Sequence, residues 1–186
     1  MYEVEVKARL KNREAVIKKL NDFGCKFGEE LHQVDHIFNQ EGVDFPPPLN
    51  SPVLRVRKQN DIYLFTLKIS QGNRTDSLER EIEIKDGEKM IEILKLIKWK
   101  ETILVDKKRI KTNVKDMEIV LDTVKDLGEF IEAEKIVVNE SQEDRKKIQE
   151  ELFDFLETLG IPKEDHVVGG KYDIMLEEVY EKLVIK

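Results

Sequence analysis

Charged and apolar residues alternate near the N-terminus of this chain. Within residues 2–9, alternate positions carry Glu3, Glu5, Lys7 and Arg9, and the positions between them are apolar. This period of two predicts a β-strand with one apolar and one charged face. Two carboxylates at alternate strand positions lie roughly 7 Å apart, at about 3.4 Å rise per residue. Such a pair suits a hard divalent cation, and the neighbouring cations suit an anion.

The same alternation recurs along later segments, and each is expected to present its charged side chains on one strand face. The basic members of these rows are Arg55, Arg57, Lys68, Lys85, Lys107, Arg109 and Lys111. The acidic members are Glu81, Glu83, Glu118, Asp122, Glu132 and Glu134. Arg and Lys bind phosphate oxygens, whereas carboxylates bind a cation such as Mg²⁺ or Mn²⁺ that bridges to phosphate. The whole set therefore predicts a ligand that contains a chain of phosphates.

The elements that must position these residues follow from the apolar periodicity. The expected strands are residues 2–9, 27–39, 53–58, 63–70, 78–85, 102–112, 117–123 and 129–138. The expected helices are residues 13–23, 87–97, 141–159 and 173–183. Residues 42–52 hold four prolines, which predicts an irregular connection.

A half-exposed sheet with a solvated polar face would explain any one of these strands. The amphipathic helices, however, need apolar sheet surface on which to pack. If they cover the outside of a closed barrel, the charged faces must line its interior. Charges gathered there are costly unless they are paired, bound to metal or facing a charged ligand. The sequence thus predicts one α+β domain over residues 1–186, a closed eight-stranded antiparallel β-barrel with a charged interior and helices packed outside.

Composition narrows the class of protein. The net charge of −7 argues against a general nucleic-acid binder, which needs a basic surface. The single cysteine, Cys25, excludes an internal disulfide and indicates a reducing compartment. No apolar run approaches the roughly 20 residues that span a bilayer, and no signal peptide precedes the first strand pattern. A cytoplasmic protein is therefore expected.

At these residues the chain resembles the CYTH family, also called triphosphate tunnel metalloenzymes. The family's N-terminal Glu-x-Glu-x-Lys signature is similar to Glu3, Glu5 and Lys7. Its Arg-x-Arg strand is similar to residues 54–57, and its late Leu-Gly-x-Phe-x-Glu-x-Glu signature is similar to residues 127–134. The signatures occur in the family's order along nearly the whole chain, so together they are more specific than any one of them.

Within the family, the chain is most similar to the class IV adenylate cyclase subgroup. The residues that carry this similarity are Gln33 and Asp35, followed by Asp44 and Phe45. The resemblance implies conversion of ATP to cyclic AMP and pyrophosphate with a divalent metal. Sister groups hydrolyse inorganic triphosphate, thiamine triphosphate or the 5′-triphosphate of RNA. A triphosphatase, a non-catalytic binder of nucleotide or polyphosphate, and a plain α+β interaction domain therefore remain alternatives.

The resemblance also implies roles for individual residues. The metal, Mg²⁺ or Mn²⁺, would be held chiefly by the catalytic carboxylates Glu3, Glu5, Glu132 and Glu134, with Glu81, Glu83 and Asp122 as further ligands or charge balance. The phosphate chain would be bound by Lys7, Arg9, Arg55, Arg57, Lys68, Lys85, Arg109 and Lys111. The implied partner is a small-molecule triphosphate, without nucleic acid or membrane, and a homodimer is the assembly considered.

Two positions depart from the family pattern. Arg80 stands one place later than the arginine of the family's central Arg-x-Glu-x-Glu, so period two turns it away from Glu81 and Glu83. Lys171 stands where the family has a serine, directly before Tyr172. The sequence predicts no role for either departure.

Overall fold

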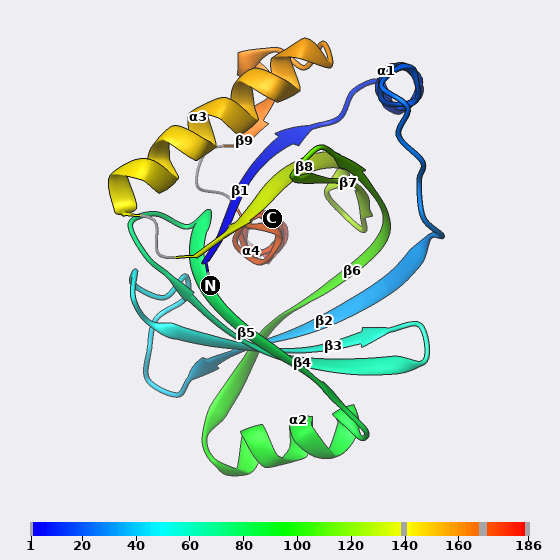
Figure 1. The fold of residues 1–186 in the computed structure, drawn as a ribbon. Helices are drawn as coiled ribbons and strands as arrows, with labels where there is room; N and C mark the ends of the chain where they lie inside the picture. The colour runs from blue at the N-terminus through cyan, green and yellow to red at the C-terminus, as the bar shows by residue number, and fades with distance from the viewer. Residues whose placement is uncertain (1, 139–140, 168–170, 185–186) are drawn as a thin grey trace.

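Eight antiparallel strands form a closed barrel in the computed structural model, which describes residues 2–138, 141–167 and 171–184 (Figure 1). The strands are β1 (Tyr2–Arg9), β2 (Leu31–Gln40), β3 (Pro52–Gln59), β4 (Ile62–Ser70), β5 (Asp76–Ile84), β6 (Trp99–Val114), β7 (Met117–Val124) and β8 (Gly128–Val137). Their order around the barrel is β1-β5-β4-β3-β2-β6-β7-β8, and β8 pairs with β1. The predicted α+β barrel is thereby confirmed.

The helices pack outside the barrel wall and across one of its ends. They are α1 (Arg13–Asp22), α2 (Gly87–Leu96), α3 (Gln142–Thr158) and α4 (Tyr172–Val184). Side chains cap the start of two of these helices: the Asn12 side chain accepts a hydrogen bond from the Ala15 amide at 3.0 Å, and the Ser141 hydroxyl accepts one from the Asp144 amide at 3.1 Å. A 3₁₀ turn (Lys163–Asp165) leads into β9 (His166–Val167), which pairs with the second half of β1.

The apolar faces of the strands point outward, toward these helices. Val4, Val6 and Ala8 of β1 are at most 1 % exposed and share a core with Leu152 and Leu156 of α3. Because strand side chains alternate, the charged residues between them must point into the barrel.

A second outer core lies under α2. Phe38 of β2 and Val56 of β3 are both fully buried against Ile91 and Leu94 of that helix. The inward-facing partners of these strand residues are therefore the polar ones, as they are in β1.

One end of the barrel, called the closed end here, is covered by α4. Tyr172 and Leu176 pack in one apolar cluster with Ile37, Ile103 and Phe130, which come from β2, β6 and β8. In Figure 1, α4 is seen end-on within the outline of the strands. The first turn of this helix consequently meets side chains that line the interior.

Element boundaries differ from the predicted ones by a few residues. β2 begins at Leu31 rather than at residue 27, and β6 extends in both directions beyond residues 102–112. The proline-rich segment is irregular, as expected, and contains a cis Phe45–Pro46 bond. No helix of the described residues is long and apolar enough to cross a membrane.

Candidate functional site

Three carboxylates meet inside the barrel on two adjacent strands. β1 supplies Glu3 and Glu5, and β8 supplies Glu134, which pairs directly with Glu5 across the two strands. One carboxylate oxygen from each of the three can be chosen so that all lie within 4.8 Å of one another. We call this group the acidic triad. Its all-oxygen donor set fits a hard divalent cation such as Mg²⁺ or Mn²⁺.

The electrostatics of the acidic triad also favour a cation. Burial, with the negative charges of Glu3, Glu118, Glu132 and Glu5 around it, raises the pKa of Glu134 to about 9. A carboxyl group in such surroundings either keeps its proton or needs a nearby positive charge. A divalent cation would supply that charge without a further side chain.

The predicted ligands Glu132 and Asp122 are engaged by cations instead. The Lys7 ammonium lies 2.9 Å from Glu132, and Arg109 binds Asp122 at 2.7 and 2.5 Å and Glu132 at 2.6 Å. These cations outweigh the effect of burial and hold the pKa of Glu132 well below its usual range. Tyr172 covers this group, with its ring centroid 4.1 Å from the Lys7 ammonium.

On the opposite wall, β3 presents two arginines. Arg57 binds Asp35 of β2 through two hydrogen bonds, at 2.6 and 2.8 Å. Burial opposes ionisation of Asp35, yet Arg57 and Lys107 together keep its pKa far below the usual value. Arg55 donates to Glu81 of β5 at 3.1 Å, so this predicted metal ligand also serves a cation.

Lys68 of β4 connects the basic wall to the acidic triad. Its ammonium donates to Glu3 at 3.1 Å and also forms an ion pair with Glu79. These two carboxylates overcome the burial of the side chain and raise the pKa of Lys68 well above its usual value. Glu3 is thereby shared between a lysine and the candidate cation position.

The remaining predicted residues lie toward the ends of the barrel. Arg9 is exposed and stacks over the Phe130 ring at the closed end. Lys111 and Glu118 form an ion pair at 2.5 Å that is partly exposed. Glu83 is exposed near the end of β5, and Lys85 follows that strand and is exposed too. The structure therefore does not bring Glu83 or Lys85 into the buried ion-pair network.

Several interior residues were missing from the predicted site. Asp35, Glu79 and Lys107 belong to the buried network, and Lys107 lies 3.5 Å from Asp35. Burial and the neighbouring Arg109 lower the pKa of Lys107 to about 8. Lys107 stands in the basic row that alternation predicted but was not assigned to the site. Glu79 could have been found, because it continues the period of two set by Glu81 and Glu83. Asp35 required knowledge of which strand lies beside β3.

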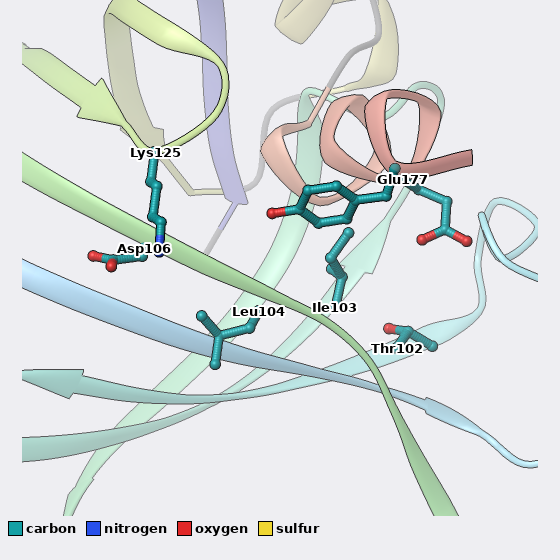
Figure 2. Close-up of a pocket in the computed structure, with 7 residues that line it drawn as sticks. Thr102, Ile103, Leu104, Asp106, Lys125 and Glu177 are labelled. Atoms are coloured by element: carbon teal, nitrogen blue, oxygen red, sulfur yellow. The ribbon is translucent and has the colours of Figure 1, made fainter. Parts of the chain in front are cut away.

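Two surface pockets lie apart from this network. The first, of about 270 Å³, lies where α4 crosses β6 (Figure 2). It is lined by Thr102, Ile103, Leu104, Asp106, Lys125, Glu177 and Tyr180. The second, of about 650 Å³, lies between the β4–β5 connection and the start of α3. Neither pocket is lined by the acidic triad or by the cations of the barrel interior.

The interior as a whole can hold a divalent cation on one wall and a polyanion on the others. The cations come from β1, β3, β4 and β6, and they surround the acidic triad from different strands. Because the strands form a closed barrel, the positions of these side chains are fixed by the register of the sheet. These features define a charged-interior barrel suited to metal-bridged phosphate.

Comparison with known proteins agrees with this class. The CYTH domain family model matches residues 1–170, and the chain belongs to this family. A protein of Methanocaldococcus jannaschii named "Putative adenylate cyclase" is 32 % identical over 174 residues, which are 92 % of this chain and 97 % of that protein.

Solved structures show the same fold. A protein of Pyrococcus horikoshii is 30 % identical, with a TM-score of 0.76 over 92 % of this chain and 97 % of its own. A Hippeastrum protein named "Putative adenylyl cyclase", and described as having a dominant triphosphatase activity, is 18 % identical with a TM-score of 0.56. It covers 92 % of each chain, and at this identity the likeness extends to the fold alone.

Proposed function

We propose that this protein is a divalent-metal-dependent enzyme that acts on a linear triphosphate, and that its reaction is the class IV conversion of ATP to cyclic AMP and pyrophosphate. The observation that carries the proposal is the acidic triad of Glu3, Glu5 and Glu134 beside the buried Lys7 and the partly buried Lys68. Family membership supports the substrate class. The name of the Methanocaldococcus jannaschii relative and the pattern around Gln33 and Asp35 favour the cyclase.

The proposed roles follow from position. The acidic triad would hold Mg²⁺ or Mn²⁺, which lowers the pKa of a hydroxyl or water nucleophile and neutralises phosphate charge when bound. Lys7, Lys68 and Arg109 neutralise the phosphate oxygens from three strands, and Arg57 with Arg55 does so from the facing wall. Fixing the chain in line with the attacking oxygen is the larger part of catalysis in phosphoryl transfer.

Proton transfer in the cyclase reaction begins at the ribose 3′-hydroxyl. The oxygen of this hydroxyl attacks the α-phosphorus, the bond from the α-phosphorus to the bridging oxygen breaks, and pyrophosphate leaves. The hydroxyl proton passes to water or to the released pyrophosphate. Glu134 lies in the acidic triad with its pKa raised to about 9 when metal is absent. We assign Glu134 to metal binding rather than to proton transfer, because the carboxylates of Glu3 and Glu5 beside it cannot neutralise its negative charge.

Hydrolysis of a triphosphate is the second candidate, and a feature of the interior favours it. Among the described strand residues, alternation places one aromatic side chain on the interior face, that of Phe130, and this ring packs against Tyr172 at 5.1 Å. The described strands therefore offer no free aromatic surface on which an adenine could stack. A tripolyphosphate needs no such surface.

A product-resolved assay separates these reactions. The purified protein is incubated with ATP, tripolyphosphate or thiamine triphosphate, each with Mg²⁺ or Mn²⁺, and cyclic AMP, pyrophosphate and phosphate are quantified. The proposal expects cyclic AMP and pyrophosphate in equal amounts from ATP, and no product in EDTA.

Two controls sharpen this assay. Glu5→Gln removes one oxygen donor of the acidic triad and should lower the rate at least a hundredfold, whereas Glu150→Gln on the exposed face of α3 should leave it unchanged. Phosphate release without cyclic AMP would assign a triphosphatase. Measurable ATP affinity without either product would leave a binding protein.

A further inference from the structure

The closed end of the barrel contains a second group of polar side chains, outside the predicted site. Lys171, directly before α4, donates to the Ser70 hydroxyl of β4 at 3.0 Å. Ser70 pairs directly with Ser77 of β5, and antiparallel partners on one face have Cβ atoms about 4.5–5.5 Å apart. Alternation along these strands places both hydroxyls on the interior face with Lys68 and Glu79.

Ser77 is a buried residue whose hydroxyl group has no hydrogen-bond partner among the described residues. Its side chain is 1 % exposed, and its hydroxyl oxygen makes no hydrogen bond within the described part of the chain. Leaving a hydroxyl unsatisfied in this way costs free energy, so it usually indicates an absent water, ion or ligand. Ser77 also pairs with Glu3 of β1, which places it next to the acidic triad.

Lys171 is a cation without an ion pair among the described residues. Burial and the positive charge of Lys68 lower the pKa of Lys171 to about 8, although Asp173, Glu5 and Glu79 act in the opposite direction. Two ammonium groups that repel each other beside an unsatisfied hydroxyl are a suitable arrangement for an oxyanion.

We propose that Lys171, Ser70 and Ser77 form a subsite for the uncapped terminal phosphoryl group of a linear polyphosphate. The proposal rests on the proposed function and adds to it the recognition of one end of the substrate. Because α4 covers this end of the barrel, a chain that enters from the other end meets Lys171 with its leading phosphoryl group. A terminal phosphoryl group carries more negative charge than an internal one, and no substituent needs to be accommodated beyond it.

A purely structural role for Lys171 would be to hold α4 on the barrel through Ser70. Ser77 distinguishes the two roles, because its hydroxyl makes no bond in the described part of the ligand-free protein. Ser77→Ala should therefore leave the stability unchanged or slightly raised, yet should weaken binding of the ligand. A structural role predicts no effect of that substitution on binding.

The test uses isothermal titration calorimetry with the full chain and Mn²⁺. The probe is the imido analogue of tripolyphosphate, whose P–N–P bridges resist hydrolysis. Lys171→Ser should weaken binding by about tenfold or more and Ser77→Ala by about threefold, in line with the loss of a charged and of a neutral hydrogen bond. Lys171→Arg should remain within about threefold of the unmodified protein, because it keeps the charge.

Matched controls keep the outcome interpretable. Lys89→Ser, on the exposed face of α2, should bind the analogue normally, and all variants should bind Mn²⁺ alone equally. Diadenosine triphosphate, which is capped at both ends, should bind the unmodified protein more weakly than the analogue does.

The possible results test the subsite and the proposed function separately. If the unmodified protein binds the analogue and Ser77→Ala binds equally well, the subsite is wrong even if Lys171→Ser is impaired. If the unmodified protein binds neither the analogue nor ATP, the proposed function fails and the subsite fails with it.

Discussion

Glu134 shows how a single carboxyl group can be poised for a cation at the expense of stability. Burial raises its pKa to about 9 in the folded protein, and the negative charges of four glutamates contribute to this rise. They are Glu3, Glu118, Glu132 and Glu5. In an unfolded chain a glutamate titrates near 4.3. Between these two values the folded protein holds a proton that the unfolded chain has released, so the free energy of unfolding falls as the pH rises.

Replacing Glu134 by Gln should therefore stabilise the metal-free protein while weakening metal binding. In EDTA at pH 7, we expect Glu134→Gln to raise the free energy of unfolding by about 1–3 kcal/mol, and to reduce its decline between about pH 5 and pH 9. Urea denaturation at several pH values measures both effects. A binding ion stabilises the folded state by mass action, so Mn²⁺ should stabilise the unmodified protein more than the variant.

The control for this prediction is Glu150→Gln, which removes an exposed carboxylate from α3. It should change neither the stability in EDTA nor the response to Mn²⁺. If Glu134→Gln were less stable than the unmodified protein in EDTA, the inference that the three carboxylates of the acidic triad repel one another would be contradicted. It would mean instead that Glu134 is neutralised by partners in the metal-free state.

At the scale of the strand, register decides which charged residues can reach a ligand. Arg55 and Arg80 lie on nearby strands of the same sheet, but alternation separates them. Arg55 pairs across β3 and β4 with Thr66, an interior position, whereas Arg80 pairs across β4 and β5 with Leu67 on the outer face. The prediction that Arg80 faces away from Glu81 and Glu83 is thus confirmed.

This register yields a paired prediction for the two arginines. Arg80→Ala should change the affinity for the imido analogue of tripolyphosphate by less than about twofold, because the side chain lies outside the barrel. Arg55→Ala should weaken binding by about tenfold or more, in keeping with the loss of a charge-assisted hydrogen bond. Calorimetry with Mn²⁺ present measures both, and equal losses in the two variants would mean that β5 has a different register in solution.

Alternation explains why much of the barrel was predictable from the sequence. It identified both faces of β1, β3 and β8, and with them Glu3, Glu5, Arg57 and Glu134. Alternation along a strand does not show which strands are neighbours in the barrel. The bidentate pair of Arg57 with Asp35 depends on β2 lying beside β3, which the residues themselves do not state.

The ends of the elements were less predictable than their faces. Lys85 continues the alternation of β5, but the strand stops at Ile84, so the side chain leaves the barrel wall. Lys171 and Tyr172 show the opposite case. They belong to a C-terminal helix, and only the packing of that helix across the closed end brings them to the interior.

For the whole molecule, the ion pairs inside the barrel link cation binding to anion binding. Lys7 and Arg109 are held by Glu132, and Lys68 is held by Glu3. A phosphate chain must attract these cations away from carboxylates, and a metal ion on the acidic triad would draw Glu3 in the other direction. Each ligand thereby weakens the internal ion pairs that compete with binding of the other ligand.

Linkage requires this effect to be reciprocal. We expect Mn²⁺ to raise the affinity for the imido analogue of tripolyphosphate by about tenfold or more, and the analogue to raise the affinity for Mn²⁺ by the same factor. Calorimetric titrations in both orders measure the two factors. Glu3→Gln weakens the hold on Lys68 and removes a triad oxygen, so it should increase the affinity for the analogue in EDTA and reduce the effect of Mn²⁺. Equal affinity for the analogue with and without Mn²⁺ would show that the cations are available to phosphate from the start, and that the ion pairs inside the barrel serve the fold alone.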